Sequence, residues 1–167
     1  MTAPVVVAIG SNSDDPVAQV RRALGRLAAL SPGTFLASSL WESSPVDCPP
    51  GSPPFVNAVV RFDPPQDLSP ESLLDLLLNW ESEAGRRRGP VPHAPRPLDL
   101  DLIAFGLERR ATPRLTLPHP RAHRRRFVLQ PLSEIAPDLV LPGWTASTRN
   151  LLAALEGDEV LRRLPDP

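Results

Sequence analysis

The fold of this chain is decided by one stretch, Arg96-Pro97-Leu98-Asp99-Leu100-Asp101-Leu102-Ile103. Its apolar residues alternate with two aspartates, a pattern typical of a β-strand with one buried face. Side chains two positions apart in a strand project from the same face, so Asp99 and Asp101 are predicted to lie side by side with Cα atoms roughly 6.6 Å apart. Aspartate is disfavoured in strands, and a pair on one face therefore indicates a specific role.

Two neighbouring carboxylates repel each other unless cations lie between them. Mg²⁺ prefers one or two carboxylates together with substrate phosphates. A pair of such ions can hold both the attacking and the leaving oxygen of a phosphoryl transfer. The alternative is a half-exposed strand whose polar face carries two aspartates without a ligand. The spacing alone leaves both interpretations open.

An arginine-rich segment surrounds this pair. Residues 86–126 contain eleven arginines and three acidic residues, although the whole chain has a net charge of −1. All 18 basic residues are arginine, whose planar guanidinium suits bidentate contact with phosphate oxygens. A genome that favours arginine codons would explain the absence of lysine, but it would not explain the clustering. The segment therefore favours a polyanionic ligand near the aspartates.

Length and composition set the broad class. A chain of 167 residues is expected to form a single domain over residues 1–167. We see no signal peptide and no segment of about 18 apolar residues, so we expect a cytoplasmic protein with no membrane partner. We also expect a monomer. The single Cys48 excludes an intramolecular disulfide and a cysteine-based zinc site. The absence of lysine also excludes a phosphate-binding P-loop.

The order of predicted elements indicates the fold class. We expect strands at residues 4–9, 35–41, 55–62 and 98–105, with helices after Asp15-Pro16 and after Ser69-Pro70, where a capping residue precedes proline. Gly10-Ser11-Asn12 is expected as a turn that closes the first strand. The order β-α-β-β-α-β predicts an α+β fold with a ferredoxin-like antiparallel sheet, both helices on one face and the other face open to a ligand.

The remaining third of the chain is expected as a C-terminal helical extension. Residues 121–136 read as a helix that Pro131 must kink or split. Residues 151–155 read as a short last helix, and residues 157–167 as a loose tail.

Asn57 and Phe55 form a second candidate site. Both project from the same face of the predicted third strand, together with Val59. A polar amide among apolar residues needs a partner, and its donors and acceptor suit the edge of a heterocycle on which Phe55 would stack. The alternative is an asparagine bonded to neighbouring backbone.

His119 lies between two prolines, which would fix the direction of its imidazole. With Arg114 and Arg121 nearby, it is a candidate donor to a phosphate oxygen. The run Arg124-Arg125-Arg126 opposes the dipole at the start of a predicted helix, and a bound anion would resolve that conflict. The alternatives are a structural histidine and solvated arginines.

Several segments carry a resemblance to a known family. They are Gly10-Ser11-Asn12, Phe55-Val56-Asn57-Ala58, Pro95 to Gly106, Pro118-His119-Pro120-Arg121, Arg125, Phe127 to Leu132 and Glu134-Ile135-Ala136-Pro137. In this order, over residues 4–142, they resemble the 6-hydroxymethyl-7,8-dihydropterin pyrophosphokinase family of folate biosynthesis. The resemblance implies transfer of the β,γ-diphosphate of ATP, the co-substrate, to the pterin hydroxymethyl oxygen, with release of AMP.

The resemblance also implies roles for individual residues. Asp99 and Asp101 would hold two Mg²⁺ ions, and with Arg86 and Arg96 they would form the catalytic set. The ATP-binding residues would be Glu81, Arg88, Arg96, Leu102, Arg114, Thr116, His119 and Arg125. The pterin-binding residues would be Ser43, Ser44, Val46, Phe55, Asn57, Asp99 and Phe127. Such a site would act by alignment and charge neutralisation, without a required general base.

The chain departs from the family pattern in the loop before the aspartates. His93 stands where the family usually has a tryptophan that closes over the pterin, and four prolines stiffen residues 90–97. We therefore hypothesise a pre-bent lid with less apolar cover. If His93→Trp leaves pterin affinity and turnover unchanged, this hypothesis fails.

A different class of function stays open from the residues alone. A non-catalytic ferredoxin-like module binding RNA or a nucleotide through its arginine-rich face would use sheet aromatics and basic residues. Phe55 is the only comparable aromatic, and the two aspartates would repel a nucleic-acid backbone. We therefore expect ATP and a pterin as partners, and no nucleic acid.

Overall fold

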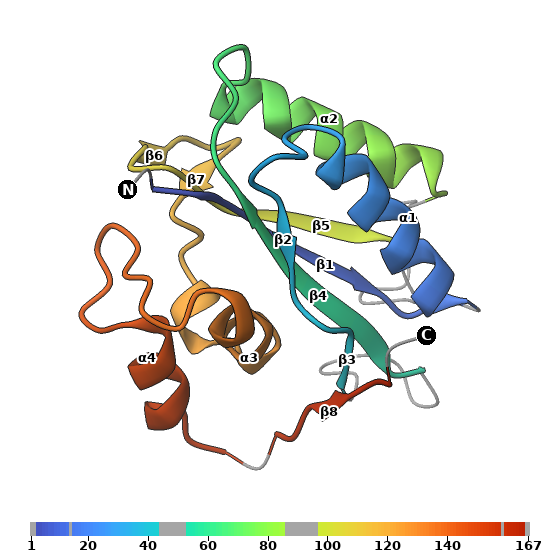
Figure 1. Ribbon diagram of the computed structural model, residues 1–167, viewed down its shortest axis with the longest axis vertical. Helices are drawn as coiled ribbons and strands as arrows, with labels where there is room; N and C mark the ends of the chain where they lie inside the picture. The colour runs from blue at the N-terminus through green and yellow to red at the C-terminus, as the bar shows by residue number, and fades with distance from the viewer. Residues whose placement is uncertain (1–2, 14, 44–52, 86–96, 158, 166–167) are drawn as a thin grey trace.

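The computed structural model describes residues 3–13, 15–43, 53–85, 97–157 and 159–165. Its main sheet contains six strands: β1 (Val5–Ser11), β2 (Leu36–Ala37), β3 (Trp41–Ser43), β4 (Phe55–Phe62), β5 (Asp99–Phe105) and β8 (Arg162–Arg163). Their order is β5-β1-β4-β3-β8, and β2 also pairs with β4 (Figure 1). Every pair is antiparallel. The predicted mixed α and β architecture with an antiparallel sheet is confirmed.

Two helices, α1 (Pro16–Ala28) and α2 (Pro70–Glu83), cover one face of the sheet (Figure 1). Both begin as the sequence predicts. The Asp15 carboxylate accepts a hydrogen bond from the backbone N–H of Ala18 at 3.2 Å, and Ser69 and Ser72 form a reciprocal capping box. Each cap satisfies an otherwise unpaired donor of the first turn. Leucines from both helices pack on the valines of β1 and β4 in one core cluster.

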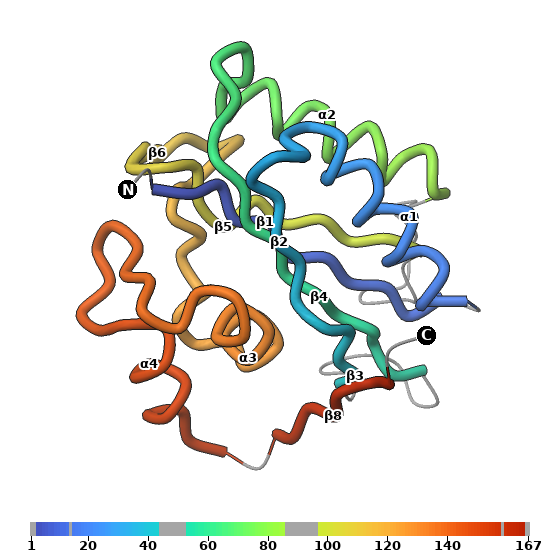
Figure 2. The backbone as a smooth tube through the Cα atoms, viewed as in Figure 1, coloured from blue at the N-terminus to red at the C-terminus, as the bar shows by residue number. Residues whose placement is uncertain are grey.

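The opposite face is less open than predicted. Helix α3 (Arg126–Ile135) lies against it, on the side of the sheet away from α1 and α2 (Figure 2). Val128 and Leu132 of α3 pack in a second core cluster with Val59 and Ile103 of the sheet. The helix has an apolar stripe that must be buried, and the middle of this sheet face is apolar. The polar end that carries the aspartates is left as the candidate site.

Several boundaries also differ from the predictions. The strand expected at residues 35–41 is two short strands, β2 and β3. The helix expected at 121–136 is split into a 3-10 turn, η1 (Ala122–Arg124), and α3, with Pro131 inside α3. The last helix, α4 (Thr148–Ala154), begins three residues earlier than expected, where Ser147 caps it.

The C-terminal segment is not the loose tail that we expected. Within it, β8 pairs with β3, where Trp41 lies opposite Arg163 and Glu42 opposite Arg162. The Arg162 guanidinium also lies 3.1 Å from the Glu42 carboxylate. The outer edge of β3 is unpaired without β8, and pairing satisfies its backbone groups. Strands β6 (Arg110–Ala111) and β7 (Thr116–Leu117) form a separate hairpin.

No helix within the described ranges is long and apolar enough to cross a bilayer.

Candidate active site

Strand β1, which lies between β5 and β4, places the candidate residues in one row across the sheet. Gly10 of β1 lies opposite Asn57 on one side and Asp99 on the other. Residues that pair across adjacent strands point to the same face. The sheet thus brings together an amide and a carboxylate that are 42 positions apart in the sequence. In the next row, Ala8 lies opposite Asp101.

Gly10 forms the floor of this row. A Cβ atom there would lie 3.4 Å from Asn57 Oδ1 and 3.8 Å from Phe55 Cδ1. The first distance is at the short end of ordinary van der Waals contact, so a side chain at this position would fill the space between Asn57 and Asp99 that glycine leaves open. We had predicted Gly10 in a turn, but it lies within β1, and its role was missed because a glycine beside Ser-Asn is also typical of turns.

The Asn57 amide is held in one orientation. Its Nδ2 donates to Ser43 Oγ at 2.7 Å and to the Trp41 carbonyl at 3.4 Å. Its Oδ1 faces the Gly10 floor, and only 5% of the residue is exposed. The alternative of an asparagine bonded to neighbouring backbone matches only the longer contact with the Trp41 carbonyl, because the shorter one is to the Ser43 side chain. The Oδ1 side is oriented as an acceptor on the face shared with Asp99.

Asp101, the second of the two aspartates, lies next to Arg125. Asp99 and Asp101 share the face opposite to Leu100 and Leu102, as the alternation predicts. Arg125 Nη1 lies 3.9 Å from Asp101 Oδ2, and the two side chains are 27% and 32% exposed. Arg125 also lies over the Phe127 ring, with its guanidinium carbon 5.5 Å from the ring centroid. A cation, two anions and an aromatic ring therefore meet at one end of the sheet.

His119 joins this group through its backbone and its ring. The backbone N–H of His119 donates to the carbonyl of Ile103 at 2.8 Å, which fixes the loop to β5. Its Nδ1 accepts from the backbone N–H of Arg121 at 3.2 Å, so the neutral ring carries its proton on Nε2. Burial lowers the pKa of His119, with further lowering by Arg125 and Arg121, while Asp99 opposes the shift.

This lowered pKa predicts a pH dependence of stability. The folded protein binds a proton at His119 less readily than the unfolded chain, in which the pKa of a histidine is about 6.5. The unfolded state thus binds more protons as the pH falls through that value, and the free energy of unfolding decreases. We expect His119→Asn to reduce this decrease, as measured by urea unfolding between about pH 7 and pH 5. An unchanged pH dependence in the variant would contradict the assignment.

Four of the predicted ATP-binding residues lie along the outer edge of β5 or on α2, and not on the sheet face that carries the aspartate side chains. Glu81 is buried in α2, where its Oε2 accepts from the backbone N–H of Leu100 at 2.7 Å. The Leu102 side chain points into the core on the α1 and α2 face, so only its backbone is available at the edge of β5. Arg114 pairs with Asp75 of α2, and Thr116 is exposed in β7. These residues lie along the outer edge of β5 and on α2.

Of the other predicted pterin-binding and phosphate-binding residues, some are described by the structure and some lie outside the described residues. Ser43 is buried at the end of β3, Phe55 is half-buried at the start of β4, and Phe127 is half-buried in the first turn of α3. Six residues of the sequence predictions lie outside the described residues: Ser44, Val46, Arg86, Arg88, His93 and Arg96.

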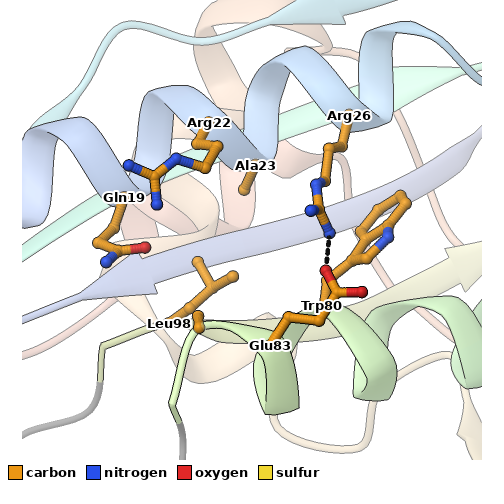
Figure 3. Close-up of a pocket in the computed structure, with 8 residues that line it drawn as sticks. Gln19, Arg22, Ala23, Arg26, Trp80, Glu83 and Leu98 are labelled. Atoms are coloured by element: carbon orange, nitrogen blue, oxygen red, sulfur yellow. Dashed lines mark hydrogen bonds and ion pairs between the residues drawn. The ribbon is translucent and has the colours of Figure 1, made fainter.

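A separate groove lies between α1 and α2, on the other face of the sheet (Figure 3). It has a volume of about 70 Å³, and its lining includes Arg22, Arg26, Trp80, Glu83 and Leu98. Arg26 donates to the Glu83 carboxylate at 2.6 Å (Figure 3) and lies 5.6 Å from the centroid of the Trp80 ring. Because Glu83 offsets the Arg26 charge, this groove is a weaker candidate for a polyanion than the aspartate face.

Comparisons with known proteins identify the family of the chain. The family model described as 7,8-dihydro-6-hydroxymethylpterin-pyrophosphokinase (HPPK) matches residues 6–137. A Haemophilus influenzae protein named 2-amino-4-hydroxy-6-hydroxymethyldihydropteridine pyrophosphokinase is 44% identical over 138 residues, which cover 81% of this chain and 83% of the relative. A Pseudomonas aeruginosa protein of the same name is 42% identical over 139 residues and covers 83% of each chain.

Solved structures support the same fold. A Plasmodium falciparum HPPK-DHPS triple mutant with pteroate superposes with a TM-score of 0.66 at 13% identity, over 92% of this chain. An HPPK-DHPS in complex with substrates superposes with a TM-score of 0.67 at 11% identity. The chain spans 43% of each of these longer proteins. From the family match and the curated relatives together, the chain belongs to the 7,8-dihydro-6-hydroxymethylpterin-pyrophosphokinase family, whose members are enzymes of folate synthesis.

Proposed function

We propose that this protein transfers the diphosphate of ATP to the hydroxymethyl group of 6-hydroxymethyl-7,8-dihydropterin and releases AMP. The single observation that carries the proposal is the row Asn57–Gly10–Asp99. It places an oriented amide acceptor beside a carboxylate pair, across a floor with no side chain. A heterocycle bound at Asn57 would therefore have its reacting substituent near the aspartates, where a phosphate chain would also be held.

Asp99 and Asp101 fit a pair of Mg²⁺ ions that the protein shares with ATP. They are partly exposed on one sheet face, and the described residues contain no group of three or more His, Cys, Asp or Glu side chains that could hold a metal. Two carboxylates completed by substrate phosphates are a donor set that Mg²⁺ accepts, unlike metals that need a full protein cage. When held by Asp99 and Asp101, the ions would neutralise the negative charge of the phosphates. Asp99 would also lie close to the attacking hydroxyl.

The pterin would lie on the Asn57 side of the row. Asn57 Oδ1 would accept from the N–H groups at the edge of the pterin, because Nδ2 is already used by Ser43 and Trp41. Phe55 and Phe127 would pack on the two faces of the ring, as aromatic side chains do with planar heterocycles. Ser44 and Val46 are proposed to complete this pocket by resemblance to the family.

The phosphates would lie on the Arg125 side. Arg125 offers a guanidinium fork, and His119 offers its Nε2–H because Nδ1 accepts from Arg121. A neutral imidazole donates one hydrogen bond and adds no charge. Arg86, Arg88 and Arg96 are proposed to complete the phosphate contacts, and the nucleoside would lie along the edge of β5, near Glu81, the Leu102 backbone, Arg114 and Thr116.

The strand order β5-β1-β4-β3 supports a ferredoxin-like arrangement, because in that fold the first and third strands lie at the centre and the fourth and second flank them. We propose that the protein acts as a single domain and a monomer in the cytoplasm.

The proposal is tested by incubating the protein with ATP, Mg²⁺ and 6-hydroxymethyl-7,8-dihydropterin, and by separating the nucleotides. We expect AMP to form only when all three are present. A protein that binds single-stranded RNA but forms no AMP would support the binding-module alternative and would contradict the enzyme.

A further inference from the structure

Glu134 of α3 connects that helix to the strand segment beside Asn57. Its Oε1 accepts from the backbone N–H of Ser39 at 3.1 Å and from Trp41 Nε1 at 2.6 Å. Its Oε2 accepts from Ser39 Oγ at 2.8 Å. Three donors on one carboxylate fix the position of the chain that enters β3, since hydrogen bonds to a charged acceptor are stronger than neutral ones.

The same strand holds the Asn57 amide. Trp41 lies opposite Asn57 in the register of β3 and β4, and the Trp41 carbonyl and Ser43 Oγ are the two acceptors for Asn57 Nδ2. Hydrogen bonds thus run from Glu134, through the Trp41 indole and the Trp41 backbone, to the amide at the floor of the candidate site. Trp41 is the residue shared by both sets of contacts.

β3 is poorly held by the sheet alone. It has three residues, and its outer neighbour β8 has two. Few ladder hydrogen bonds therefore resist a shift of this strand. Because the Asn57 orientation depends on acceptors in β3, a contact that fixes β3 also fixes the acceptor that Asn57 presents to a ligand.

We infer that Glu134 is a positioning residue for pterin recognition, acting through Trp41 and Ser43 on Asn57. This inference rests on the proposed function. Glu134 does not touch the ligand itself, and its effect is on the binding of the heterocycle rather than on the binding of ATP. A purely structural role, in which Glu134 only keeps α3 on the sheet, would affect both substrates, because Arg125 on the phosphate side directly precedes α3.

The test compares Michaelis constants for the two substrates in three variants. We expect Glu134→Ala to raise the KM for the pterin about fivefold, which corresponds to the loss of about one net hydrogen bond. The KM for ATP is expected to change less than about twofold. Glu134→Gln keeps an oxygen at the position that accepts from Ser39 and Trp41, so we expect it to restore the pterin KM to within about twofold of the parent value. Trp41→Phe removes the indole donor but keeps an aromatic ring and the backbone carbonyl that accepts from Asn57, and is expected to be intermediate.

The matched control is Glu83→Ala, which removes a surface carboxylate bonded to Arg26 on the other face of the sheet and should leave both constants unchanged. Equal changes in both constants for Glu134→Ala, or a glutamine variant as impaired as the alanine variant, would overturn the inference. If Glu134→Ala does not fold, Trp41→Phe decides the question by the same comparison. Absence of AMP formation by the parent protein would instead contradict the proposed function and is seen before any variant is made.

Discussion

Replacing Asp101 with asparagine is expected to reduce AMP formation by about three orders of magnitude or more, because the several kcal/mol of charge stabilisation that a carboxylate-held metal supplies would be lost. The same change should leave the fold intact. The Asp101 side chain is 32% exposed and its ion pair with Arg125 spans 3.9 Å, so the pair contributes about 1 kcal/mol or less to stability. Removing the charge also relieves repulsion by Asp99.

The measurements for this prediction are the initial rate of AMP release and the thermal unfolding midpoint. Glu83→Gln is the control, because it neutralises a carboxylate on the other face of the sheet and should leave the rate unchanged. An Asp101→Asn variant that keeps about a tenth of the parent rate or more would show that this carboxylate does not hold an essential metal.

The second large effect is expected at Gly10. A valine there would place its Cβ 3.4 Å from Asn57 Oδ1 and would extend two methyl groups over the floor between Asn57 and Asp99. We expect kcat/KM for the pterin to fall by about two orders of magnitude or more, since both the space for the ring and its hydrogen-bond acceptor are affected. The KM for ATP should change much less, because the phosphate side of the site lies beyond Asp101.

Two smaller substitutions separate this effect from a loss of folding. Gly10→Ala adds only the Cβ and should be impaired less than valine. Gly25→Ala introduces the same group within α1, where nothing lies within 4 Å of the new Cβ, and should raise helix stability by about 0.5–1 kcal/mol without affecting catalysis. Equal pterin kinetics for Gly10→Val and the parent protein would mean that the pterin lies elsewhere.

The parts of the site that depend on local periodicity could be predicted from the sequence. The alternation of residues 98–102 places Asp99 and Asp101 on one face, and the same rule places Phe55 with Asn57. The starts of α1 and α2 followed from a capping residue and a proline in sequence. Each of these features depends only on residues that are close in sequence, within about two helical turns or a few strand positions.

The parts that depend on distant contacts could not be predicted in this way. The pairing of β8 with β3 and the contact of Glu134 with Trp41 join residues that are more than 90 positions apart. The packing of α3 on the second face joins Val128 to Val59, which lies 69 positions earlier. The role of Gly10 also depends on its two neighbours across the sheet. No local pattern encodes such pairings, because many apolar stripes and short strands are equivalent until the whole chain is packed.

In the proposed reaction, the β- and γ-phosphates of ATP move together onto the pterin at the Asp99/Asp101 face. The most direct measurement supplies ATP with distinguishable labels on the β- and γ-phosphorus atoms and follows each label after separation of the products. We expect both labels to appear in the pterin product in equal amounts, with one unlabelled AMP released for each pterin consumed. Transfer of the γ label alone with formation of ADP, or no transfer of either label to the pterin, would contradict the proposed reaction.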